Sequence, residues 1–208
     1  MNFLRCILLL LLGTRLAPGQ AAPPNKTSGL PNQPEALVRG LYEQVMTRQP
    51  VGIPEGADMK VFAPYLSKAL LHRIDSATAC LDDWYRQNPD PHLKPEIGWL
   101  ELGYFSGANE RASPQTFNLE RTQSEKDGSF RVYVKLTRSY PDGHPSIWRV
   151  AVVVVRENGH FAVNDVIYLK DDVRDAEGRL SEALSAGCDG SHWVGDRDQR
   201  NDQKPQQK

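Results

Sequence analysis

The sequence has few cysteines, no long apolar run and no excess of basic residues, and each absence excludes a class of protein. Its 3 cysteines never occur as Cys-x-x-Cys, the usual pattern of redox-active or metal-binding thiols. Its longest apolar run, residues 6–12, is far shorter than the roughly 20 residues that span a bilayer. Its net charge is −1 and its basic residues are not clustered, unlike those of a nucleic-acid-binding protein.

The common catalytic and cofactor-binding motifs are also missing. The chain has no Gly-x-Ser-x-Gly, no phosphate-cradling glycine loop and no dinucleotide fingerprint. The histidines are His72, His92, His144, His160 and His192. Their spacing does not fit a zinc site, so we expect no metal and no other cofactor.

The first 21 residues have the pattern of a secretory signal peptide. Arg5 provides a charged start, the apolar run follows, and small residues lead to a cleavage site after Ala21 or Ala22. We therefore expect a periplasmic or secreted protein without a membrane span.

The mature chain is expected to form one domain over residues 34–194. Residues 22–33 are rich in proline and polar residues and predict a disordered linker. Residues 195–208 have no large apolar side chain and predict a disordered tail.

Two cysteines remain after cleavage, Cys80 and Cys188, and an oxidising compartment favours a disulfide between them. The bond would close a loop of about a hundred residues, which stabilises a protein by roughly 4 to 5 kcal/mol in the chain-entropy model. It would fasten the C-terminal end of the chain to a long helix.

Two amphipathic helices are expected in the first half of the domain. One begins at Pro34, has apolar residues three and four apart, and ends at Gln49 and Pro50. Ser67 is expected to cap the longer one, which Asn88 and the proline after it terminate. Its apolar stripe is Leu66, Leu70, Ile74, Ala77, Leu81 and Trp84.

The second half is rich in strands. Asn-Gly and Asp-Gly pairs mark tight turns, and short connections predict an antiparallel meander whose central hairpin is the valine-rich stretch 146–170. We expect an α+β fold in which the long helix lies within a curved sheet, with a short C-terminal helix over 179–186. The candidate strands are 99–105, 115–122, 129–138, 146–156 and 160–169.

Asp165 is the one candidate catalytic residue, because simple alternation places it on the apolar face of the last strand. Burial there disfavours the ionised form unless a cation or a hydrogen-bond donor compensates. The expected partners are Arg149 and Lys135 on neighbouring strands and His72 on the long helix, and these four residues form the predicted ligand-binding set. Alternatively, a β-bulge turns Asp165 outward, or its carboxylate accepts hydrogen bonds that hold the sheet.

Helices followed by a meander resemble the nuclear transport factor 2-like fold, a curved sheet wrapped around a long helix to make a cone. Three short motifs are similar to the uncharacterised bacterial envelope family typified by the lipoprotein YbjP: Ala63-Pro64-Tyr65-Leu66-Ser67, Asn164-Asp165-Val166 and Arg179-Leu180-Ser181. The resemblance implies an envelope location and brings no catalytic residues. This chain departs from the lipoprotein because Cys6 stands at the start of the apolar run, whereas a lipid-modified cysteine would follow the run.

Three functions are compatible with these features. The first is a non-catalytic binding module that takes an envelope protein or a small ligand at the cone mouth or on the polar face of the sheet. The second is a small nuclear transport factor 2-like isomerase, dehydratase or hydrolase with Asp165 as general base. The third is an envelope immunity or inhibitor protein. The missing catalytic motifs favour the first.

Overall fold

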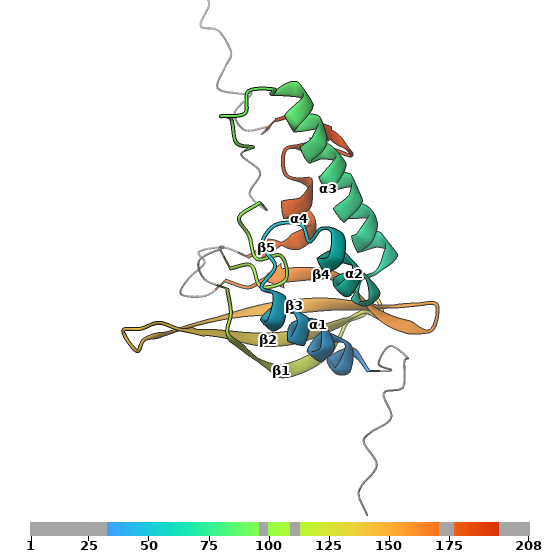
Figure 1. Ribbon diagram of the computed structural model, residues 1–208. Helices are drawn as coiled ribbons and strands as arrows, with labels where there is room; N and C mark the ends of the chain where they lie inside the picture. Colours follow the sequence, from blue (N-terminus) through green and yellow to red (C-terminus); the bar gives the residue numbers. More distant parts are fainter. Residues whose placement is uncertain (1–32, 96–99, 109–112, 171–176, 196–208) are drawn as a thin grey trace, which may run out of the picture.

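The computed structural model describes residues 33–95, 100–108, 113–170 and 177–195, which form an α+β fold (Figure 1). The expected signal peptide and nearly all of the expected linker and tail lie outside these residues. In chain order the elements are α1 (Pro34–Arg48), α2 (Gly56–Phe62), the 3-10 helix η1 (Ala63–Tyr65), α3 (Lys68–Gln87), β1 (Thr116–Ser124), β2 (Phe130–Ser139), β3 (Pro145–Glu157), β4 (His160–Tyr168), β5 (Gly178–Arg179), α4 (Leu180–Ser185), β6 (Cys188–Asp189) and β7 (His192–Trp193).

Both expected long helices form, and local sequence explains where they begin and end. Pro34 occupies the first turn of α1, where its missing N–H is no loss, and Gln49 ends the helix in a left-handed conformation with φ of 46°. The Ser67 hydroxyl accepts a hydrogen bond from the Leu70 N–H (3.0 Å) and so caps α3 as predicted. Among the described residues, no helix has the length and apolar character needed to cross a membrane.

Strands β1 to β5 form one antiparallel sheet in sequence order, which confirms the meander. The β3–β4 turn uses Asn158 and Gly159 with φ of 50° and 82°, the positive angles that a tight hairpin requires. One face of the sheet packs on the helices. Its fully buried side chains on β2 and β3 are Val132, Val134, Leu136, Val150, Val152 and Val154.

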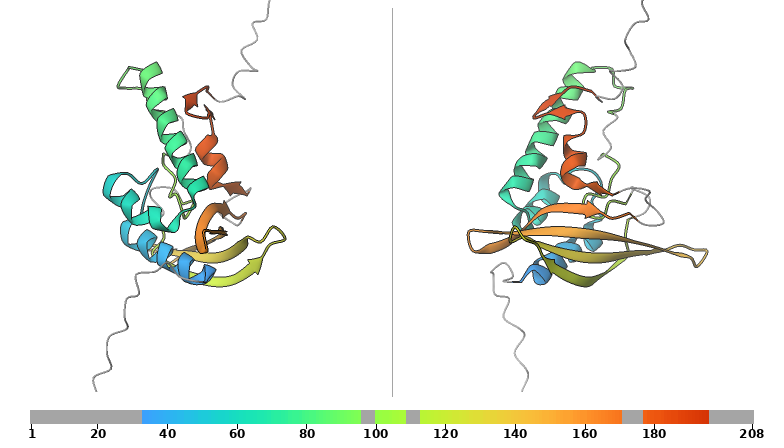
Figure 2. Two further views of the ribbon diagram at one scale, coloured as in Figure 1. Left: turned by 90° about the vertical axis from the view of Figure 1, so that its right-hand side faces the viewer. Right: turned by 180° about the vertical axis from the view of Figure 1, so that it is seen from behind.

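The helix that lies across the sheet is α1, which packs on β1, β2 and β4 (Figure 2). Helix α3 meets the sheet mainly at β4 and then leads away from it, packing on α4, β6 and β7. The expectation that the long helix lies within the curve of the sheet is therefore wrong. The physical reason is that Ser67 ties the start of α3 to β4, because its N–H donates to Val163 O (2.8 Å) and its hydroxyl to Asn164 Oδ1 (2.8 Å).

The strand expected over 99–105 is absent from the described part of that range, 100–105, which forms turns instead. This segment has no need of a neighbouring strand, because buried side chains satisfy its backbone carbonyls. The three bonds are Tyr42 Oη to Phe105 O (2.6 Å), Trp148 Nε1 to Ser106 O (2.9 Å) and Tyr168 Oη to Tyr104 O (2.9 Å). They join the segment to α1, β3 and β4.

Tyr42→Phe should lower the free energy of unfolding by about 1 to 3 kcal/mol, because it leaves the buried Phe105 carbonyl without a donor. Tyr104→Phe is the matched control. The Tyr104 hydroxyl is buried and has no hydrogen-bond partner among the described residues, so its removal should leave stability unchanged or raise it. Urea titration measures both, and equal losses would contradict the role given to Tyr42.

The predicted disulfide is confirmed: Cys80 of α3 and Cys188 of β6 are bonded, with Cα atoms 6.1 Å apart. Next to it, Asp83 Oδ2 accepts a hydrogen bond from the Trp193 N–H (2.9 Å), which holds the pKa of Asp83 below its usual value. Gln87 Nε2 donates to Trp193 O (3.2 Å). The hairpin of β6 and β7 is thus fastened to α3 by covalent and polar bonds.

Replacing both Cys80 and Cys188 by alanine should lower the free energy of unfolding by about 4 to 5 kcal/mol, since the bond closes a loop with a sequence separation of 108. Urea unfolding with and without a thiol reductant measures this. The reductant should destabilise the native protein and have no further effect on the variant. Equal unfolding midpoints for the two oxidised proteins would contradict the prediction.

Candidate functional site

A β-bulge at Asn164 changes which side chains of β4 face the helices. Val163 and Asp165 pair with consecutive residues of β3, Val154 and Val153, so Asn164 is the extra residue. The alternation therefore shifts, and Asp165 lies on the face of the sheet opposite α1, where the first turn of α4 meets it. The core side chains of β4 are Phe161, Val163, Val166 and Tyr168. The prediction from strict alternation is wrong, and the bulge alternative is confirmed.

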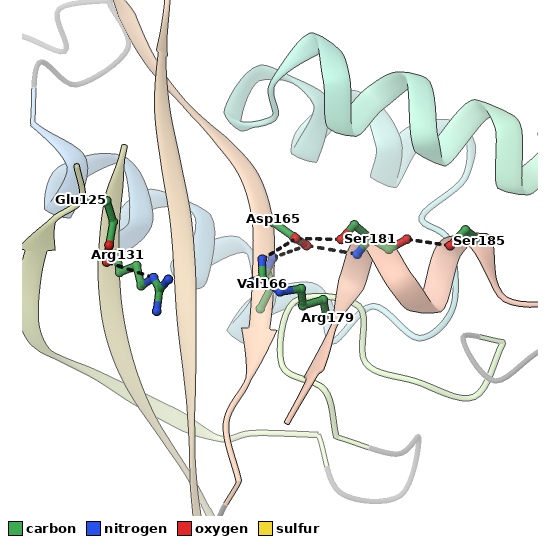
Figure 3. A network of polar contacts seen from close by, with 7 residues as sticks. All are labelled: Glu125, Arg131, Asp165, Val166, Arg179, Ser181 and Ser185. Carbon is green, nitrogen blue, oxygen red and sulfur yellow. Dashed lines mark hydrogen bonds and ion pairs between the residues drawn. The ribbon is translucent and has the colours of Figure 1, made fainter. Parts of the chain in front are cut away.

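Asp165 is 5% exposed, and four donors surround its carboxylate (Figure 3). The bonds are Val166 N (2.9 Å) and Ser181 N (3.0 Å) to Oδ1, and Ser181 Oγ (2.8 Å) and Arg179 Nη1 (3.4 Å) to Oδ2. Two of them come from the first turn of α4, so Asp165 satisfies the start of that helix from a neighbouring strand. A carboxylate has about four lone-pair sites, and these donors occupy them.

The four predicted ligand residues do not form one site. Lys135 and Arg149 are cross-strand neighbours on the face of the sheet opposite α1. His72 lies on α3, beside a cleft between α3 and α4. Asp165 lies between the two regions and contacts residues of each.

We define the outer face as the face of the five-stranded sheet opposite α1. The right-hand view of Figure 2 looks at the molecule from this side. Its cations are Arg121, Arg131, Lys135, Arg149 and Arg179. Its carboxylates are Glu120, Glu125 and Asp165. Among the described residues of this face, five cations against three carboxylates leave an excess of two positive charges, and Lys126 and Asp127 of the β1–β2 turn, which line the same face, cancel each other. The whole chain, by contrast, has a net charge of −1.

The arginines of the outer face remain accessible even though they form ion pairs. Arg131, Arg149 and Arg179 are each paired with a carboxylate, and their side chains are 38%, 45% and 41% exposed. Ion pairs at this exposure are worth about 0 to 1 kcal/mol, because water screens them. Arg121 has its guanidinium carbon 4.0 Å from the centre of the Tyr133 ring and lies over it.

A hollow of about 410 Å³ opens on the outer face next to the β1–β2 turn. Val153 of β3 lines it and is the cross-strand neighbour of Arg131 on β2 and of Asp165 on β4. Asp165 in turn accepts a hydrogen bond from Arg179. Lys126 of the turn also lines it. The hollow therefore brings together three cations, Lys126, Arg131 and Arg179, and the carboxylates of Glu125 and Asp127.

The second region, the α3–α4 cleft, has a volume of about 500 Å³. Its polar lining residues are His72, Arg73 and Ser76 from α3 and Ser181, Glu182 and Ser185 from α4. Cys188 also lines it, so the disulfide lies at its edge. The part of the chain that the structure describes contains no group of three or more His, Cys, Asp or Glu residues that could hold a metal ion.

Sequence reasoning missed Arg73 and Ser181 in the cleft and Arg131 and Arg179 on the outer face. Arg131 could have been found, because it alternates with buried residues of β2. The other three were not predictable, because Arg73 and Ser181 meet across the cleft and Arg179 meets Asp165 only in the folded chain. Comparison with models of known protein families, with curated proteins and with solved structures found no match.

Asp165→Ala should lower the free energy of unfolding by about 3 kcal/mol, because it removes a buried, charge-assisted network. Ser181→Ala removes only the bond from its hydroxyl and should cost about 1 kcal/mol. Urea titration measures both, and hydrogen exchange should show faster opening of α4. An Asp165→Ala variant as stable as the native protein would show that the carboxylate is not structural.

Proposed function

We propose that this protein is an exported, non-catalytic binding module whose outer face recognises an acidic partner protein of the cell envelope. The observation that carries the proposal is the gathering of five cations on one face of a chain with net charge −1. The signal-peptide pattern supports export. The Cys80–Cys188 bond does so too, since disulfides persist in oxidising compartments.

The chemistry of the outer face suits carboxylates. A guanidinium presents a planar fork that binds a carboxylate with two parallel hydrogen bonds, and Arg149 uses that fork on Glu120 through Nε and Nη2 (3.0 Å each). Because this pair is exposed, a partner's carboxylate can compete for it at small cost. An excess of positive charge also attracts an acidic partner before contact.

The geometry of Asp165 supports a binding role over the enzyme alternative. A general base needs a free lone pair directed at a substrate proton, whereas the Asp165 carboxylate is 5% exposed and holds four protein donors. An envelope immunity or inhibitor protein would use the same outer face, with an acidic toxin or enzyme as its partner.

We also propose that the chain has the nuclear transport factor 2-like fold and is related to the bacterial envelope family of YbjP. A sheet of five antiparallel strands with helices on one face supports the cone. The course of α3 counts against it, because α1 takes the position across the sheet that the long helix occupies in that fold.

The experiment is fluorescence anisotropy of the mature protein with a labelled oligoglutamate peptide, using an oligoglutamine peptide for comparison. The outer-face variant Arg121→Gln, Lys135→Gln, Arg149→Gln should bind oligoglutamate about tenfold or more weakly, since it loses three accessible cations. Added salt should weaken the native complex.

The matched control is the triple variant Arg39→Gln, Lys60→Gln, Lys94→Gln, which loses the same charge from exposed positions away from the sheet. Its affinity should stay within about threefold of the native value, a change of under 1 kcal/mol. Equal losses in both triple variants would mean that net charge alone attracts the peptide. Equal binding of oligoglutamine would sink the proposal.

A further inference from the structure

The α3 side of the α3–α4 cleft carries hydrogen-bond donors. Ser76 follows His72 by four positions and Arg73 by three, and all three residues line the cleft from α3. Within the described residues, none of these three side chains forms a hydrogen bond or ion pair with another residue. Arg73 is exposed and lines the cleft, so its five N–H donors are available to a ligand there.

The α4 side carries acceptors. Ser181 Oγ gives its only proton to Asp165 Oδ2 (2.8 Å), and Ser185 Oγ lies within hydrogen-bonding distance of the carbonyls of Ser181 (3.3 Å) and Glu182 (3.1 Å). Each hydroxyl has one proton, so both serines present lone pairs to the cleft. Glu182 adds an exposed carboxylate to the same side.

We propose that this cleft binds a small zwitterion, an amino acid or a short peptide, independently of the outer face. The ligand carboxylate pairs with Arg73 and His72, and its ammonium group pairs with Glu182 and the serine oxygens. Leu184, which also lines the cleft, takes an apolar side chain. A volume of about 500 Å³ lies within the range of small-molecule sites, roughly 300 to 1,000 Å³.

The charges of the cleft discriminate against other ligands. A purely anionic ligand that fills the cleft meets Glu182, and a purely cationic one meets Arg73. A site gains selectivity when it holds a charge that repels the ligands it must reject. Only a molecule with both charges satisfies both sides.

Two bonds fix the distance between the sides of the cleft. Cys188 is bonded to Cys80, one helical turn beyond Ser76 on α3, and this holds the C-terminal end of α4. Ser181 is bonded to Asp165, which holds the other end. The cleft is therefore formed before the ligand arrives, which reduces the entropy lost on binding.

The experiment is isothermal titration calorimetry of the oxidised mature protein with glycyl-leucine, N-acetyl-glycyl-leucine and glycyl-leucinamide. Native protein should bind glycyl-leucine in a saturable manner and each blocked form about tenfold more weakly, because each lacks one charge-assisted contact. Arg73→Gln should bind the free acid and the amide equally. Glu182→Gln should bind the free amine and the acetylated form equally.

Arg39→Gln and Glu43→Gln are the matched controls, since they make the same changes at exposed positions of α1. Both should bind glycyl-leucine as the native protein does. The proposal is overturned if the native protein shows no saturable heat at millimolar dipeptide. It is also overturned if N-acetyl-glycyl-leucine binds as tightly as the free dipeptide, or if the controls lose as much affinity as the cleft variants.

Discussion

The buried carboxylate of Asp165 is the interaction on which both candidate binding regions depend. It accepts hydrogen bonds from Arg179 of the outer face and from Ser181 of the α3–α4 cleft. These bonds hold the C-terminal helix against the edge of the sheet. A buried charge is stable only when donors surround it, and here the first turn of α4 supplies two of the four. The Asp165 carboxylate on β4 thus sets the orientation of α4.

The C-terminal segment also explains the course of the long helix. The apolar stripe of α3 extends past the end of the sheet, and α4 with the hairpin of β6 and β7 covers it there. The Cys80–Cys188 bond and the Asp83 carboxylate hold that cover in place. Without this segment, the part of α3 beyond the sheet would expose its apolar side to water, which is unfavourable in proportion to the exposed area.

The two candidate regions differ in the kind of ligand they suit. The outer face is broad, with cations spread over several strands and most of them half-exposed, which suits a protein surface. The cleft is a concave space with donors and acceptors on opposite sides, which suits a small molecule. The Asp165 network lies between the two regions and contacts a residue of each.

The sequence by itself determined the local structure: the cap at Ser67, the turn at Asn158-Gly159, the two long helices, four of the five expected strands, and the disulfide between Cys80 and Cys188. These features depend on neighbouring residues or on simple counting. Tertiary structure decided the rest. The bulge at Asn164 reversed the direction of Asp165, side chains far along the chain satisfied segment 100–108 in place of a strand, and contacts with α4 drew α3 off the sheet. Each of these outcomes is set by partners dozens of residues away, and no local pattern of polar and apolar residues encodes them.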